Sequence, residues 1–299
     1  MRPLPGALSV GGAAIPAWNS GAQAPPAVSP PFSSTWLRHA GTPDIGFQAA
    51  SGVVVDVDRK QVLWARADRA ERAPASLTKI VTSMVAADLA PLDRQVTVPA
   101  EAAVEADSTV MGLSPGETVT LRDLMYGVFL ESGNDAAETL ARTLTPRPHF
   151  IDLMNAKAAA LGMTDSHFTN PTGLDDPALH STAYDLAVAG AALAIHYPEL
   201  LAISGTRQVA LPASGAHKAF EMHALNRLIG SYPGATGLKT GYTDNAGYCL
   251  VGTAMRAYRH LVAVVMGDGL TLTADAVKLL DYGFSVTPAT VPEGVWRSA

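Results

Sequence analysis

The stretch Ala75-Ser76-Leu77-Thr78-Lys79, continued by Ile80-Val81-Thr82-Ser83-Met84-Val85-Ala86-Ala87, decides the interpretation of this chain. It predicts the first turns of a buried helix, because Pro74 precedes it as a start signal and apolar residues recur at helical spacing. Ser76 and Lys79 would then share one face of the helix, one turn apart. A serine hydroxyl becomes a good nucleophile when a base takes its proton, and a lysine amine with a lowered pKa is such a base. One helical turn can therefore hold a nucleophile and its activator.

The same pair also has a simpler interpretation. A serine at a helix start is commonly a cap, and a lysine is commonly a solvated cation. Taken alone, Ser76 and Lys79 favour that simpler interpretation. Only partners elsewhere in the chain can make them a catalytic pair.

The composition is that of a well-buried globular protein. Of 299 residues, 48% are hydrophobic and only 16% are charged, with a net charge of −6. Nucleic-acid binding would need a basic stripe, which the sequence lacks, so we expect no nucleic-acid partner. Cys249 is the only cysteine, so no intrachain disulfide can form, and its apolar neighbours predict inert burial.

The start of the chain differs from the rest. Residues 1–40 are rich in Pro, Gly, Ala and Ser, and Arg2, the apolar run from Leu4 to Trp18 and Ala22-Gln23-Ala24 together resemble a weak secretory signal. A disordered leader or a misplaced start are the alternatives. We expect a leader over 1–40, a catalytic domain over 41–287 and a short tail over 288–299. No later stretch is long enough to span a membrane.

Hydrophobic patterning predicts an α+β protein. A β-hairpin is expected over 48–64, with its turn at 58–60. Further strands are predicted at 95–98, 117–120, 206–211, 237–242, 246–255 and 259–267, and helices at 121–130, from 135, at 150–161, 181–196 and 273–282. This order segregates the helices from an antiparallel sheet. The fold class is thus an antiparallel β-sheet flanked by helices, with a helical subdomain.

Two further short motifs carry polar groups. Ser132-Gly133-Asn134 lies on a predicted loop between helices, where a hydroxyl and an amide can be aimed into a cleft. Lys239-Thr240-Gly241 opens a predicted strand, where a lysine and a threonine could hold a carboxylate. A helix break and an exposed strand lysine are the simpler interpretations of each motif alone.

Together the motifs occur in the order S-x-x-K, S-x-N and K-T-G, a signature of serine acyl-transfer enzymes that bind penicillin. The surrounding sequence resembles the D-alanyl-D-alanine carboxypeptidase family, the low-molecular-mass penicillin-binding proteins, over roughly residues 48–284. The stretches that carry this resemblance are 74–79, 111–117, 132–137, 161–165, 167–174 and 237–243. The resemblance implies a β-lactamase/transpeptidase-like fold. It also implies a location outside the cytoplasm, in the periplasm or cell wall.

The resemblance implies a serine mechanism on peptidoglycan stem peptides. Ser76 would attack the carbonyl between the last two D-alanines, and Lys79 would take the proton of the hydroxyl. Ser132 would relay a proton to the leaving D-alanine. The backbone N–H groups of Ser76 and Tyr242 would form the oxyanion hole. β-Lactam antibiotics would acylate the same serine and leave slowly.

The resemblance also implies the substrate-binding residues. Lys239 and Thr240 would grip the terminal carboxylate, and Asn134 the peptide chain. Gly241 and Tyr242 complete the binding strand. No cofactor and no metal are implied, and the scattered histidines, among them His167, His180 and His217, form no ligand motif.

Two departures and three alternatives stay open. The middle motif is S-G-N rather than S-D-N, and the sequence ends soon after Phe284, so we expect neither the C-terminal β-domain nor the membrane anchor of many relatives. A β-lactamase would need a glutamate to activate the deacylating water, yet Asp165 is the only acid between Met163 and Thr172. A D,D-endopeptidase would use the same residues. A catalytically silent cell-wall binder would keep only the fold.

Overall fold

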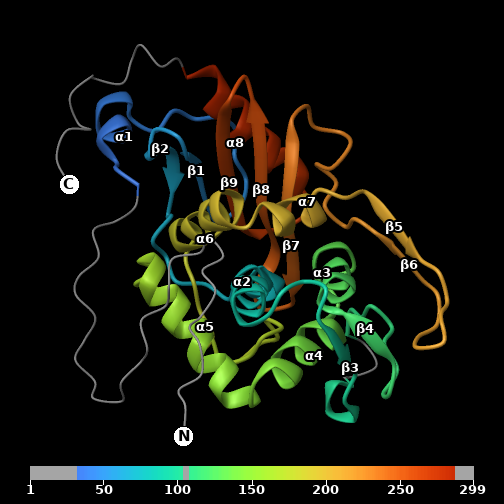
Figure 1. Ribbon diagram of the computed structural model, residues 1–299. Helices are drawn as coiled ribbons and strands as arrows, with labels where there is room; N and C mark the ends of the chain where they lie inside the picture. The colour runs from blue at the N-terminus through green and yellow to red at the C-terminus, as the bar shows by residue number, and fades with distance from the viewer. Residues whose placement is uncertain (1–31, 104–107, 287–299) are drawn as a thin grey trace, which may run out of the picture.

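The computed structural model describes residues 32–103 and 108–286, and its centre is an antiparallel sheet. The strand order is β2-β1-β9-β8-β7, so β7 is an edge strand (Figure 1). The strands are β1 (Ser51–Asp56), β2 (Gln61–Arg66), β7 (Ala235–Thr243), β8 (Gly247–Arg256) and β9 (Arg259–Asp268). The hairpin and the three-stranded meander predicted from the sequence are both present. The predicted α+β class is confirmed.

Both faces of the sheet are buried, and the alternation of side chains explains why. Along β9, Val262, Val264 and Met266 belong to one hydrophobic cluster. The intervening Leu261, Ala263 and Val265 belong to the other. Successive residues of a strand point to opposite faces, so a continuous apolar run predicts a strand covered on both sides. Helix α6 (Ala183–His196) covers one face and α8 (Leu272–Ser285) the other (Figure 1).

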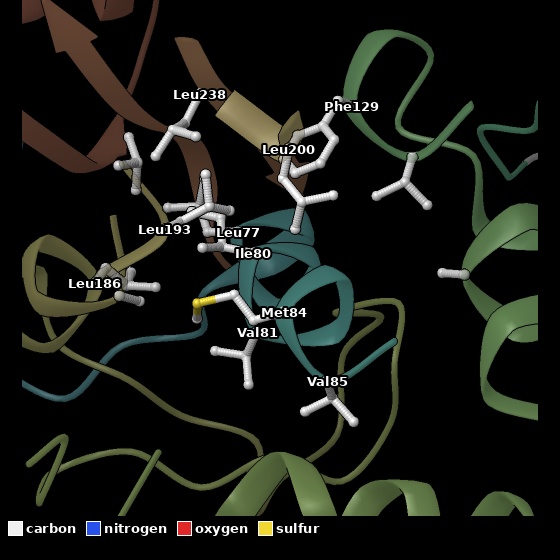
Figure 2. Packing of buried hydrophobic residues seen from close by; sticks show 14 of the residues in the cluster. Leu77, Ile80, Val81, Met84, Val85, Phe129, Leu186, Leu193, Leu200 and Leu238 are labelled. Carbon is white, nitrogen blue, oxygen red and sulfur yellow. The ribbon is translucent and has the colours of Figure 1, made fainter. Parts of the chain in front are cut away.

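Helix α2 (Lys79–Leu89) lies at the centre of the helical side of the molecule. Figure 2 shows the apolar side chains of this region, from Leu77 to Val85, gathered with Leu186 and Leu193 of α6 and with Leu238 of β7. Because residues 79–86 of α2 are all buried, a polar group in that part of the helix is taken out of water. This burial fixes the position and the chemistry of the first residue of the helix.

The helical subdomain lies beside α2. It contains α3 (Leu121–Leu130), α4 (Asn134–Leu144) and α5 (Arg147–Leu161). A capping box starts α3, since Asp123 N donates to Thr120 Oγ1 and Thr120 N donates to Asp123 Oδ2. The smaller elements are β3 (Gln95–Thr97), β4 (Thr118–Thr120), the 3-10 turn Ala100–Ala102, α7 (Pro198–Ser204), β5 (Gln208–Leu211) and β6 (Phe220–His223).

Three local features differ from the sequence-based expectation. Residues Ala75–Thr78 form a 3-10 turn, and α2 begins only at Lys79. Helix α7 follows a break at Tyr197, where Pro198 starts a new helix instead of ending the region. Strand β6 was not predicted, because it has only 4 residues and only Phe220 and Met222 of them are buried.

The expected leader also begins to join the fold before residue 40. Phe32 is 5% exposed and belongs to the main hydrophobic cluster. Its backbone N–H donates to Tyr184 Oη, and that hydroxyl donates to the Phe32 carbonyl, both at 3.1 Å. Helix α1 (Thr35–Ala40) follows. The single aromatic residue that anchors this segment gives no periodic pattern, so composition alone assigned it to the leader. The rest of the expected leader, and the tail over 288–299, lie outside the described residues.

Across residues 32–103 and 108–286, none of the helices taken singly has the length and apolar character of a membrane span, although the bent pair α6–α7 passes by length and composition.

Candidate active site

Ser76 and Lys79 meet at the junction of the 3-10 turn and α2. Lys79 Nζ lies 2.8 Å from Ser76 Oγ, and Lys79 is fully buried. The backbone that presents the serine is unusual, since Ala75 has a φ of +48°. A non-glycine residue in that region is uncommon and often marks a functional turn. The spacing of three residues predicted from the sequence thus brings hydroxyl and amine into hydrogen-bond contact.

The Lys79 amine has two further partners, both of which can only accept. Asn134 Oδ1 lies 2.6 Å from Nζ and the carbonyl oxygen of Thr172 lies 2.7 Å away. As the structure has them, all three contacts are hydrogen bonds that Nζ donates. A neutral amine has two N–H donors and one lone pair, and the Ser76 hydroxyl is the only one of the three partners that can itself donate. The three partners therefore place Nζ where its base form can accept the proton of the serine.

The electrostatics agree with that assignment. Burial lowers the pKa of Lys79 well below its usual value of 10.5, and the charge of Lys239 lowers it further, while Asp135 raises it. Burial disfavours the charged form of an amine because the charge loses its hydration. The amine is therefore in the base form over a pH range in which an ordinary lysine is charged.

Asp135 fixes the position of the loop that carries Ser132 and Asn134. Its carboxylate accepts the backbone N–H groups of Met111, Gly112 and Leu113, each at 2.8 Å. Asn134 begins α4 with its Oδ1 on Lys79, and its Nδ2 donates to Ser108 Oγ.

Ser132 is the strained residue of that loop. It has a φ of +60° and lines the same cavity as Ser76. Its carbonyl accepts a hydrogen bond of 3.0 Å from Thr109 Oγ1. No signal in its sequence context predicts the left-handed backbone, which turns the chain from the end of α3 into α4.

The Thr172 carbonyl is a functional group that the sequence analysis missed. Asn170 Oδ1 fixes its loop by accepting the N–H groups of Thr172 at 3.1 Å and Gly173 at 2.7 Å. Gly173 has a φ of +84°, and a Cβ there would lie 1.8 Å from the Ala75 carbonyl oxygen, so only glycine fits. A backbone oxygen has no side-chain signature. The only sequence signal for this loop is the turn Asn170-Pro171-Thr172-Gly173.

Strand β7 closes the site on the opposite side. Lys239 is fully buried and its Nζ donates to the carbonyl of Thr240 at 2.7 Å. Burial lowers the pKa of Lys239 to about 7. A Cβ on Gly241 would lie only 2.9 Å from Ser76 N, so the strand passes directly against the turn that presents the nucleophile. An edge strand in this position leaves backbone donors beside the Ser76 hydroxyl.

These groups surround one cavity of about 790 Å³. The residues that line it are Ser76, Ser108, Thr109, Ser132, Asn134, Gly173, Leu174, Leu225, Asn226, Arg227, Thr240, Gly241, Tyr242, Thr243, Tyr248, Leu250 and the loop 269–274. Of the predicted site residues, Lys79 and Lys239 are absent from this wall, because they lie buried beneath it. Tyr242 is half exposed at the rim and packs on Tyr248, with ring centroids 4.6 Å apart.

Other polar residues that the sequence analysis considered do not line the cavity. Asp165 forms a surface ion pair with Arg69 at 3.3 Å. Cys249 is buried, and burial raises the pKa of its thiol to about 11. His167 and His180 pair through their backbones. Within the described ranges, no group of three or more His, Cys, Asp or Glu residues could hold a metal ion.

A serine hydroxyl hydrogen-bonded to a buried lysine amine, where a 3-10 turn meets a helix beside an edge strand, defines a serine acyl-transfer site. The family model described as D-alanyl-D-alanine carboxypeptidase (peptidase S11) matches residues 38–269. The chain therefore belongs to the D-alanyl-D-alanine carboxypeptidase family.

Two curated relatives show how far the similarity reaches. The D-alanyl-D-alanine carboxypeptidase DacB2 of Mycobacterium tuberculosis is 38% identical over 248 residues, which cover 80% of this chain and 84% of that protein. DacF of Bacillus subtilis is 34% identical over 251 residues, covering 82% of this chain and 64% of that protein. The chain thus spans about two thirds of the length of the Bacillus relative.

Solved structures share the fold. A D-alanyl-D-alanine carboxypeptidase from Mycobacterium tuberculosis has a TM-score of 0.74 and 36% identity, over 83% of this chain and 96% of that one. Penicillin-binding protein D2 from Listeria monocytogenes, in its cefotaxime-bound form, has a TM-score of 0.72 and 28% identity, over 81% of this chain and 100% of that one.

The contact between β7 and the Ser76 turn leads to a prediction. Gly241→Ala should push the strand away from Ser76 N, because a Cβ has only 2.9 Å there. We expect at least about a tenfold slower acylation of Ser76 by a penicillin, because outright removal of one oxyanion donor costs about 10²–10³ in rate and a displaced strand misplaces one. Stopped-flow labelling measures it.

Gly269→Ala is the matched control, because it lines the same cavity and its Cβ would meet nothing within 4 Å. Equal acylation rates for Gly241→Ala and the unsubstituted protein would show that the strand is not held against the nucleophile.

Proposed function

We propose that this chain is a serine-type D-Ala-D-Ala carboxypeptidase that removes the terminal D-alanine of peptidoglycan stem peptides. The observation that carries the proposal is the buried amine of Lys79, 2.8 Å from Ser76 Oγ at the floor of a cavity. Family membership supports the same activity. The reaction outside the cytoplasm, where peptidoglycan lies, is part of the proposal.

Acylation begins with the hydroxyl. Ser76 Oγ adds to the carbonyl carbon of the penultimate D-alanine while its proton passes to Lys79 Nζ. The negative charge that develops on the carbonyl oxygen is received by the backbone N–H groups of Ser76 and Tyr242, a contribution of about 3–4 kcal/mol per donor. The C–N bond then breaks, the leaving nitrogen receives a proton through Ser132, and an ester remains on Ser76.

Deacylation regenerates the free enzyme. Water adds to the ester carbonyl, Lys79 again takes the proton, and the bond to Ser76 Oγ breaks with reprotonation of the serine. The product is the shortened peptide with a new carboxyl group. Thr240 and the buried Lys239 hold the terminal carboxylate of the substrate, and Asn134 orients its peptide chain.

A β-lactam would use the same route and stop at the ester. Its amide resembles the scissile peptide bond, and the leaving group stays attached and blocks the water. The cefotaxime-bound structure of the Listeria relative supports the assignment of β-lactams as inhibitors.

The alternatives are less well supported. A β-lactamase needs an acid beside the ester, whereas Asp165 is engaged at the surface with Arg69 and does not line the cavity. A catalytically silent binder would not need a desolvated lysine, which costs free energy to bury. An endopeptidase would use the same groups on a longer leaving group, and D-alanine release from a pentapeptide against cleavage of a cross-linked dimer separates the two.

The nucleophile gives the first functional prediction. Wild-type protein treated with benzylpenicillin should gain one adduct on Ser76 by mass spectrometry and should release D-alanine from a stem pentapeptide. Ser76→Ala should lose both activities while it stays folded, because the Ser76 hydroxyl is the only one on Lys79 Nζ in the part of the chain that the structure describes.

Ser83→Ala is the matched control. Ser83 is fully buried on the same helix and its hydroxyl has no partner among the described residues, so its removal should leave labelling intact. An adduct that persists in Ser76→Ala would assign the nucleophile elsewhere.

The pH dependence of acylation gives the second functional prediction. Lys79 accepts a proton only when neutral, so the acylation rate should rise with pH through the pKa of Lys79. In Lys239→Met this rise should move to higher pH, because the Lys239 charge lowers the pKa of Lys79 in the native protein. Stopped-flow rates from pH 5 to pH 10 measure the shift. An unmoved profile would remove Lys239 as a cause of the low pKa.

The rate at which a β-lactam leaves the enzyme gives the third functional prediction. Benzylpenicillin should leave Ser76 much more slowly than D-alanine is released from a pentapeptide, since the described residues that line the cavity include no carboxylate to activate the deacylating water. Both turnover rates are measured on one preparation. Faster penicillin hydrolysis would favour the β-lactamase.

A further inference from the structure

Two histidines meet at the base of the loop that supplies the Thr172 carbonyl. His167 and His180 form an isolated antiparallel bridge, in which the N–H of each donates to the carbonyl of the other, at 2.9 and 3.1 Å. Residues paired in this way carry their side chains on the same face. The two imidazole rings lie with their centroids 6.1 Å apart and are tilted by 32° to each other. The fold thus pairs two histidines that the sequence separates.

The tautomer of His180 is set by its own turn. Its Nδ1 lies 2.9 Å from the carbonyl oxygen of Ala178, and a carbonyl oxygen can only accept. The neutral ring therefore carries its proton on Nδ1, and Nε2 keeps its lone pair. An imidazole that donates one ring N–H to a backbone carbonyl is the usual form of a metal-binding histidine. His180 is consequently held in the form that binds a metal ion.

The His167 ring is exposed, and no hydrogen bond or ion pair holds it within the described residues. With zinc–nitrogen bonds of about 2.0–2.1 Å, two imidazoles on one tetrahedral ion have centroids roughly 5 Å apart. The His167 ring has to move by only about 1 Å to reach that separation. One ring is thus fixed in a ligand form and the other can turn to complete the pair.

We propose that His167 and His180 bind one divalent transition-metal ion of the zinc or copper type, with water in the remaining positions. Imidazole suits these ions, whereas magnesium and calcium prefer oxygen ligands. Two protein ligands are one fewer than a catalytic zinc site has, so the ion exchanges readily with solvent. Neither histidine lines the cavity of Ser76, so the ion has a structural role. This inference does not rest on the proposed function.

The ion closes the segment between the two histidines into a ring. That segment, residues 168–179, contains Asn170, whose side chain accepts the N–H of Thr172 at 3.1 Å. It also contains the Thr172 carbonyl, whose oxygen lies 2.7 Å from Lys79 Nζ. The metal therefore cross-links the base of a loop that contacts the catalytic amine. It stabilises the folded chain, because the unfolded chain does not hold the two rings together.

Titration calorimetry with Zn²⁺ tests the site, on protein that carries no histidine tag and has been treated with a chelator. The unsubstituted protein should bind one Zn²⁺ per chain, and His167→Ala should weaken that binding at least about tenfold, since even the loss of a supporting group costs 10–100-fold in affinity. Saturating Zn²⁺ should raise the Tm of the unsubstituted protein by about 2–4 °C and leave that of His167→Ala unchanged. Benzylpenicillin labelling of Ser76 without metal checks that the variant is folded.

NMR of protein labelled with ¹⁵N in histidine identifies the ligand atoms. Zn²⁺ should shift the Nε2 resonance of His180, while Nδ1 keeps its proton. His217→Ala is the matched control, because the His217 ring lies beside Phe220 and not beside a second histidine. It should bind Zn²⁺ as the unsubstituted protein does. Absence of binding in the unsubstituted protein, equal binding in His167→Ala, or loss of binding in His217→Ala would overturn the inference.

Discussion

The site depends on one uncharged amine in a place that water does not reach. Lys79 Nζ has two oxygen neighbours that can only accept and one hydroxyl that can donate. A charged ammonium would also have to bear the loss of its hydration and the nearby Lys239 charge. Burial and the Lys239 charge thus lower the pKa of the amine, and its contacts with the two oxygens leave the lone pair of the base form for the nucleophile. Protonation state and geometry both follow from the packing around Lys79.

The residues that pack around Lys79 come from distant parts of the chain. Asn134 comes from the start of α4, and the Thr172 carbonyl comes from a loop ordered by Asn170. Asp135 ties the first of these to residues 111–113 by three backbone hydrogen bonds. Because α2 is packed between these segments and the sheet, the site cannot form before the two parts of the fold have met. Stability of the core and competence of the site are therefore linked.

Strand β7 gives the site its second half. Glycine at 241 allows the strand to approach the Ser76 turn, and glycine at 173 allows the opposite loop to approach the same turn. Both positions exclude a side chain for steric reasons. The serine is consequently confined between two backbones, which restricts its motion and surrounds it with backbone donors and acceptors instead of flexible side chains.

Much of this architecture follows from the sequence because local signals agree with the fold. The Val-rich runs that predict strands are buried on both faces, Thr120 and Asp123 form the capping box, and Gly162 ends α5 in the left-handed conformation. The S-x-x-K spacing is informative for the same reason, although the serine lies on a 3-10 turn and not on the helix itself.

What the sequence could not predict are groups defined by tertiary position. The Thr172 carbonyl is a backbone atom, and His167 and His180 are brought together by a bridge that no local pattern predicts. The full burial of Lys239 and its absence from the cavity lining were likewise not predicted. Which side of a wall a lysine lies on depends on the neighbouring strand and helix, and no local pattern encodes that.

The most direct test of this account is the pKa of Lys79 itself. Protein labelled with ¹³C and ¹⁵N in lysine, with Lys79 assigned by its loss in Lys79→Arg, gives that value from the titration of the Cε and Nζ resonances. The account predicts a pKa well below 10.5, with the amine neutral where an ordinary lysine is charged. A Lys79 amine that titrates at its ordinary value would be an ammonium at neutral pH, and it could not serve as the base for Ser76.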